Sequence, residues 1–265
     1  MVRHNDQQLV AHDGQYIFLP PWVAGEVGYG NVAKPDVFAT TTVQQYPINT
    51  RYVDGDRLFK YVYVGGVDGT YTKANIGLYC AVVENASVTT GTTASVVGDT
   101  TQQIADATAA VNKYAGGFWM PRVNPYSSYR VLSNTVSDGT HVTLTLERAI
   151  ITAIGAAQAS CHLMENPYSD ARCTWAAGRD DVGFLGITLL DTILTTYQWV
   201  QVAGPCHVVP YNEEMGAAAN VQQGSFHIDG TVIAHAAAAR QHMGYAMPHT
   251  GTTSTWFIML QVATL

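Results

Sequence analysis

Residues 197–211 read YQWVQVAGPCHVVPY, and this stretch decides the fold class. Its large apolar side chains fall on both faces of an alternating pattern, which is typical of a strand that is covered on both sides. We therefore expect Trp199 to belong to the core rather than to form a sugar-stacking platform. Gly204 and Pro205 are expected to stop the pairing before HVV resumes it, because proline has no amide hydrogen to donate. The segment predicts a rigid central strand.

The composition favours the same class. Only 12% of the 265 residues are charged, whereas Gly (24), Tyr (15) and Thr- and Val-rich stretches are abundant. Such a composition suits strands and turns better than surface helices that carry ion pairs. We predict an all-β protein with antiparallel sandwich or barrel-like β domains and an extended N-terminal arm.

Three further segments carry informative patterns. Residues 57–64 have apolar side chains on both faces, which predicts another strand covered on both sides. Residues 141–146 alternate strictly and predict a half-buried strand that faces inward through Val142, Leu144 and Leu146. Residues 100–114 leave two alternatives open, because they fit one helical face with a capping-box spacing and also two short strands.

The predicted organisation is an arm at residues 1–40, a β-rich domain at 41–160 and a second β-rich domain at 161–265. The arm contains FLPPWVAGEVGYGNVAKPD (18–36), in which prolines block ladder hydrogen bonds and glycines loosen the backbone. Each large apolar side chain of the arm would gain about 1.5 to 3 kcal/mol from burial. The arm therefore docks either on a partner or on its own body, and the sequence favours neither alternative.

Net charge and hydropathy argue against two classes of partner. The formal charge of −7 and the pI near 5.6 leave no basic stripe that would neutralise nucleic-acid phosphates. No stretch approaches the roughly 18 to 20 apolar residues that span a bilayer, and residues 1–15 lack the hydrophobic core of a signal peptide. We expect no nucleic-acid or membrane partner, and a chain that is made in the host cytoplasm.

The residue types that bind metals or perform catalysis form no known motif. The four cysteines lie far apart and are expected to be buried thiols: Cys80, Cys161, Cys173 and Cys206. A C-terminal group of histidines recurs every seven or eight residues, which does not place them on one face of a strand or helix: His227, His235, His242 and His249, with Asp229 among them. Nucleophile and phosphate-loop signatures are also missing from the sequence. We predict no catalytic residues, no cofactor, no metal and no enzymatic activity.

Several phrases of the sequence occur in an order that resembles a family of tailed-phage virion proteins, the capsid decoration or cement type. They are QQYPINTR (44–51), DRLFKYV (56–62), AVNKYAGGFW (110–119), SSYRVLS (127–133), HVTLTLERAI (141–150), NPY (166–168), VGF (182–184) and YQWVQVAGPC (197–206). The likeness covers roughly residues 40 to 206. It departs at FWMP (118–121) and VNP (123–125), where the family has a polar, Gly-rich hairpin.

The resemblance implies a β-rich subunit on the outer surface of a capsid, with the major capsid protein as its partner and a homo-oligomer, dimer or trimer, at a symmetry axis. Such a protein bridges neighbouring capsomers and stabilises the head. The family has a shorter N-terminal region, so the role of the arm is not part of this resemblance. From their residue types, the aromatic and proline-rich segments are the predicted contacts with the capsid or with other copies: Tyr16, Phe18, Leu19, Pro20, Pro21, Trp22, Phe118, Trp119, Tyr126 and Tyr129.

Two other functions remain open at this point. A tail-associated or receptor-binding virion protein would use exposed tyrosines, such as those of NPYSSYR (124–130), to bind host surface glycan. An enzyme that acts on surface polysaccharide would need a pair of carboxylates, and the sequence offers no convincing pair.

Overall fold

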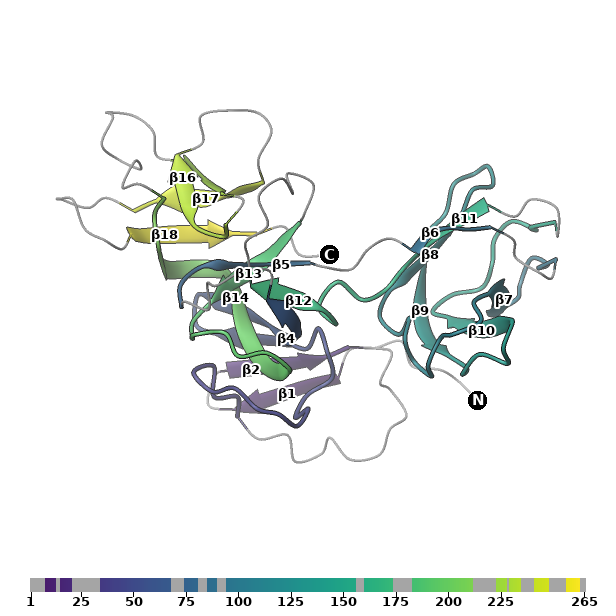
Figure 1. The fold of residues 1–265 in the computed structure, drawn as a ribbon, viewed down its shortest axis with the longest axis horizontal. Coiled ribbons are helices and arrows are strands. Elements are labelled where there is room, and N and C mark those ends of the chain that lie inside the picture. The colour runs from purple at the N-terminus through teal and green to yellow at the C-terminus, as the bar shows by residue number, and fades with distance from the viewer. Residues whose placement is uncertain are drawn as a thin grey trace. The chain divides into compact units, whose positions relative to one another are not determined.

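The computed structural model describes residues 8–12, 15–20, 34–67, 74–80, 85–89, 94–155, 160–173, 183–211, 223–227, 229–234, 241–247 and 256–262. Within these ranges every regular element is a strand, and no helix is present (Figure 1). The all-β prediction is thereby confirmed. Among the same residues no helix has the length and apolar character needed to cross a membrane.

The chain forms two compact units, which we call unit 1 and unit 2. Unit 1 is built around Val82–Pro167, and unit 2 is built from Leu9–Leu19, Tyr29–Ala81 and Tyr168–Leu265. The chain leaves unit 2 after Cys80 and returns to the neighbouring strand, because Ala171 pairs with Cys80. Unit 1 is therefore an insertion between two adjacent strands of unit 2. These boundaries differ from the predicted ranges 41–160 and 161–265, because this pairing joins segments far apart in the sequence.

Unit 2 contains one sheet that closes on itself. Its strand order is β1-β2-β3-β4-β12-β5-β13-β14-β18-β17-β15-β16, with a further pairing of β4 with β14. The bounds are β1 Gln8–His12, β2 Gln15–Leu19, β3 Arg51–Asp54, β4 Arg57–Val67, β5 Gly77–Cys80, β12 Ala171–Cys173, β13 Phe184–Thr188, β14 Thr196–Val208, β15 Gln223–Phe226, β16 Val232–Ala234, β17 His242–Ala246 and β18 Trp256–Gln261.

The extra pairing makes β4, β12, β5, β13 and β14 a closed ring of strands, which is a small barrel (Figure 1). A ring with an odd number of strands cannot alternate direction throughout, so one neighbouring pair must be parallel. That pair is β4 with β12, and the other pairs of the ring are antiparallel. Every strand of the ring has a neighbour on both sides, while the sheet continues beyond the ring to β1 at one end and to β16 at the other.

Strand β14, which contains the opening segment, is the central strand of unit 2. It pairs with β4 from Thr196 to Ala203 and with β18 from Ala203 to Val208. The predicted stop at Gly204 and Pro205 is wrong, because both residues pair with β18. Gly204 adopts φ +91, a conformation that glycine tolerates, and the carbonyl of Pro205 still accepts a hydrogen bond from Gln201 Nε2 at 2.8 Å. The proline costs one donor and does not end the strand.

Both faces of β4 and β14 are covered, as predicted. Val62, Val64 and Val200 are fully buried in the apolar core of the barrel. On the other face Trp199, only 3% exposed, packs against aromatic rings, with ring centroids 5.0 Å from Tyr61 and 5.1 Å from Tyr46. The expectation that Trp199 is a core residue is confirmed.

The described part of the N-terminal arm folds onto its own body. Strand β2 pairs with β3, so that Ile17 lies opposite Tyr52 and Phe18 opposite Arg51. Ile17 and Leu19 are fully buried. Of the two alternatives left open by the sequence, the structure supports docking on the same chain for residues 15–20.

Unit 1 has its own sheet and its own core. The strand order is β6-β11-β8-β9-β10-β7. The bounds are β6 Asn85–Thr89, β7 Thr101–Ala105, β8 Phe118–Pro121, β9 Tyr129–Asn134, β10 His141–Leu146 and β11 Ser160–Met164. Residues 100–114 form strand β7 followed by turns, which excludes the helical alternative. Val142, Leu144 and Leu146 of β10 are buried in the core, as the alternation predicts.

Candidate functional site

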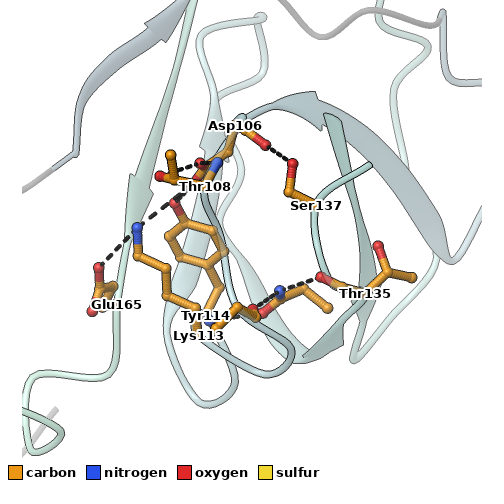
Figure 2. Close-up of polar contacts among 9 residues, drawn as sticks. Asp106, Thr108, Lys113, Tyr114, Thr135, Ser137 and Glu165 are labelled. Carbon is orange, nitrogen blue, oxygen red and sulfur yellow. Dashed lines mark hydrogen bonds and ion pairs between the residues drawn. The ribbon is translucent and has the colours of Figure 1, made fainter. Parts of the chain in front are cut away.

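A polar cluster in unit 1 gathers two carboxylates, an ammonium group and a phenol (Figure 2). Asp106 directly follows β7, and its carboxylate accepts hydrogen bonds from the Tyr114 hydroxyl and from the Thr108 backbone N–H, the latter at 2.8 Å. Lys113 Nζ lies 3.6 Å from Asp106 Oδ2 and 3.6 Å from Glu165 Oε1. Figure 2 shows the lysine side chain extended beside the Tyr114 ring, with its ammonium group between the two acids.

The local backbone fixes this arrangement. Asn134, at the end of β9, accepts a hydrogen bond from the Tyr114 backbone N–H at 2.8 Å, and its side-chain amide donates to the Ala110 carbonyl at 2.9 Å. Ser137 Oγ donates to the Asp106 carbonyl at 2.6 Å. The turns that follow β7 are therefore bound to the segment after β9. The Tyr114 side chain is fully buried in the core of the unit.

The charges of the cluster stabilise one another. Burial alone would raise the pKa of Asp106, but the hydrogen bonds from Tyr114 and Thr108 and the charge of Lys113 outweigh it, so that pKa is lowered. Burial alone would lower the pKa of Lys113, but its contacts with Tyr114 and the charges of Asp106 and Glu165 raise it. At neutral pH both groups are ionised.

These protonation states favour a stable ion pair over a reaction between the two side chains. Condensation of a lysine with a carboxylic acid, with loss of water, requires a neutral amine and a protonated acid. Asp106 and Lys113 are held in the opposite states. The same argument applies to a general acid or base, whose pKa should lie near the working pH. The geometry is that of a clamp that holds the turns of unit 1 together.

Of the C-terminal histidines singled out in the sequence, His227 lies beside Asp229. His227 Nδ1 lies 2.8 Å from Asp229 Oδ1, although the two atoms are not aligned for a hydrogen bond. The Tyr211 ring stacks on the imidazole at 3.9 Å between centroids. Asp229 also accepts a hydrogen bond from the Thr231 backbone N–H at 2.9 Å, so it fixes the turn before β16.

His242 is exposed on β17, while His235 and His249 lie outside the described residues. In the part of the chain that the structure describes, no group of three or more His, Cys, Asp and Glu side chains could hold a metal ion. Cys161, Cys173 and Cys206 are buried and Cys80 is half-buried, and all four are free thiols. Burial raises the pKa of Cys206 to about 12.

The predicted contact residues fall into three groups. Leu19, Trp119 and Tyr129 are at most 2% exposed, and Pro20 is buried, so the prediction that they form a contact surface is corrected. Leu19 is the last residue of β2 and its side chain is fully buried, and Trp119 and Tyr129 belong to the core of unit 1, with their rings 5.4 Å apart. Pro21 and Trp22 lie outside the described residues.

The remaining predicted residues are accessible. Tyr126 is 80% exposed on the connection between β8 and β9, and Tyr16 is 41% exposed. Phe18 and Phe118 are half-buried, and each carries an arginine on its ring: Arg51 at 4.0 Å from the Phe18 centroid and Arg130 at 4.9 Å from that of Phe118.

Sequence reasoning missed an exposed apolar group on each unit. In unit 1, Val96, Val97 and Ile151 are each at least 52% exposed, and their segments are joined by hydrogen bonds between Gly98 N and Ile150 O and between Ile150 N and Asp99 O. We call them the unit 1 apolar group. Their sequences, SVVGDT (95–100) and AIIT (149–152), read as buried strand fragments, so no local signal indicated exposure.

In unit 2, Val43, Ile193 and Leu194 are each at least 47% exposed. We call them the unit 2 apolar group. Thr41 and Tyr197 exchange two backbone hydrogen bonds, of 3.0 and 2.7 Å, which hold the segment just before Val43 against the start of β14. Thr196 Oγ1 donates to the Ile193 carbonyl at 2.6 Å and closes that turn. Ile193 and Leu194 are therefore exposed on a turn that a hydrogen bond holds in place.

No protein-family model, curated protein or solved structure matches this chain.

Proposed function

We propose that this protein is a bacteriophage capsid decoration protein, which binds the outer capsid lattice and bridges neighbouring capsomers. The single observation that carries the proposal is that each of its two units holds its own exposed apolar group on a hydrogen-bonded support. The ordered phrases between residues 44 and 206 favour the same function.

The apolar groups suit attachment by surface contact. Burying a Val, Leu or Ile side chain contributes about 1.5 to 3 kcal/mol, so three such side chains on one unit supply a useful but modest driving force. Association itself costs at least about 4 kcal/mol, which leaves each contact weak alone. Two weak contacts in one chain act together, because binding of the first raises the effective concentration of the second. A bridge between capsomers has this property.

A low content of charge supports the same role. Interface cores are depleted in Lys, Glu and Asp and enriched in aromatic residues, and only 12% of this chain is charged. The chemistry of the proposed function is non-covalent and needs no catalytic group.

A second candidate is a receptor-binding virion protein that recognises host surface glycan. The observation that favours it is Tyr126, which is 80% exposed on the connection between β8 and β9 and could stack on a sugar ring. This candidate would be favoured if the wild-type protein binds a saccharide but not heads, and if the Tyr126→Ala variant loses the saccharide binding.

Binding to heads tests the proposal. Purified protein is mixed with heads isolated from a phage that lacks its gene, and bound copies are counted as its concentration rises. The expected result is saturation at a fixed number of copies per head, with slower loss of DNA from decorated heads on heating. Replacing Ile193 and Leu194 by Ser should weaken binding, whereas the matched exposed Val136→Ser variant should bind like the wild type. Absence of saturable binding by the wild-type protein would contradict the proposal.

A further inference from the structure

One end of unit 1 brings exposed arginines next to the unit 1 apolar group. Arg148 Nη2 donates to the Ser128 carbonyl at 2.9 Å, and its guanidinium lies 5.1 Å from the centroid of the Tyr129 ring. The Ile151 backbone N–H donates to the Tyr129 hydroxyl at 3.1 Å. The segment after β10 is thus held against the start of β9.

The connection between β8 and β9 joins the same end of the unit. It begins after Pro121, ends before Tyr129, and carries Arg122 and Tyr126, both exposed. The antiparallel pairing of Phe118 with Arg130 and of Trp119 with Tyr129 brings the two ends of this connection together. We call the resulting surface the Arg122–Arg148 face. It consists of Val96, Val97, Arg122, Tyr126, Arg148 and Ile151.

The two arginines of this face have no acidic partner among the described residues. The hydrogen bond of Arg148 goes to a neutral carbonyl, and no ion pair joins either Arg122 or Arg148 to a described carboxylate. The nearby Glu147 is engaged by Arg130 at 3.7 Å. Among the described residues, these two guanidinium groups therefore have no carboxylate partner, although the net charge of the chain is −7.

From this arrangement we infer that the Arg122–Arg148 face binds an acidic surface of a protein partner. Guanidinium groups form paired hydrogen bonds with carboxylates, and Arg and Tyr are the side chains most enriched where protein interfaces gain their binding energy. The aliphatic Val96, Val97 and Ile151 favour a protein over a saccharide, because they have no polar atom to offer to hydroxyl groups. The inference rests on the proposed function, in which the partner is the lattice subunit of the capsid.

Zero-length crosslinking tests the inference on assembled virions. Arg122→Lys and Arg148→Lys keep the positive charge and supply an amine that a carbodiimide couples only to a carboxylate in direct contact. The expected result is a crosslink from either substituted position to an Asp or Glu of the lattice subunit. Lys34, which is exposed in unit 2, is the internal control and should give no such crosslink.

The outcomes separate the inference from the proposed function. A crosslink to an acidic residue of another virion protein supports the face and contradicts capsid decoration. If the chain is present on heads and neither substituted position crosslinks to a carboxylate, the inference is overturned while the proposed function stands. A crosslink to a second copy of this chain also overturns the inference, as does saccharide binding that is lost when Arg122 or Arg148 is replaced.

A binding measurement gives the size of the effect. Arg122→Glu should weaken binding to heads by at least about tenfold, since it places a carboxylate opposite the acids of the partner. Lys34→Glu changes the net charge equally and should bind like the wild type. Equal affinities for the two variants would contradict the inference.

Discussion

Removing the hydroxyl of Tyr114 is the most informative single change in unit 1. The Tyr114→Phe variant keeps the fully buried ring and deletes the hydroxyl, which donates a hydrogen bond to Asp106 and also interacts with Lys113. A hydrogen bond to a charged group contributes about 1.5 to 3 kcal/mol. Asp106 keeps its bond from the Thr108 backbone and its ion pair with Lys113, so no carboxylate is left without a partner. We expect a loss of about 2 kcal/mol, or roughly a thirtyfold rise in the unfolding constant of unit 1.

Hydrogen exchange measured by mass spectrometry localises this loss. Peptides that cover residues 106–117 should lose protection at neutral pH, while peptides from β14 should not change. Tyr126→Phe makes the same chemical change at an exposed position of the same unit and should have no effect. Unchanged protection of residues 106–117 in Tyr114→Phe would refute the clamp.

The effect should depend on pH with a defined sign. The folded-state pKa of Asp106 lies below its ordinary value of 3.8, so its charge stabilises the fold above that pH, and this stabilisation is lost as the pH falls through the folded pKa. The difference in stability between the wild type and Tyr114→Phe should therefore be constant near neutral pH and shrink below about pH 4. A difference that grows on acidification would show that Asp106 is not the charged partner.

Three further predictions follow from particular contacts. Gly204→Ala should destabilise unit 2 by more than about 2 kcal/mol in urea unfolding, because the added methyl group would collide with the Asp56 carbonyl and because φ of Gly204 is +91. The control Gly55→Ala also has a positive φ but has open space around it, so it should cost about 1 kcal/mol. Intact mass spectrometry should give the mass of the unmodified chain, because Asp106 and Lys113 stay ionised and do not condense to an amide. A mass lower by one water, restored in a variant that lacks Lys113, would contradict this. A thiol reagent at neutral pH should not modify Cys206 until the protein unfolds, and fast modification of the native chain would contradict its burial.

Local patterns were sufficient to predict individual strands. The alternation at 141–146 and the apolar side chains on both faces of 57–64 and 197–203 correspond to β10, β4 and β14. These predictions succeed because the period of two in a strand is a property of neighbouring residues. The ambiguity at 100–114 arose because Thr, Val and Ala fit both periods, and only the pairing of β7 with β10 settles it.

Contacts between distant segments were not predictable in this way. The pairing of Cys80 with Ala171, which makes unit 1 an insertion, leaves no periodic signal in either strand. The same holds for Glu165, which reaches Lys113 across the unit. Trp119 and Tyr129 were misjudged because their neighbourhood is rich in turn residues. FWMP (118–121) consists of four apolar residues and has no alternation in the sequence, so the alternating burial that places Trp119 inside is visible only in the structure.

The most direct test of the account is an image reconstruction of purified virions in which this chain is located and its copies are counted. The account predicts density for the chain on the outer surface of the capsid lattice, repeated at every equivalent position and in contact with more than one capsomer. Density at the tail tip alone, or a chain missing from the head, would contradict it.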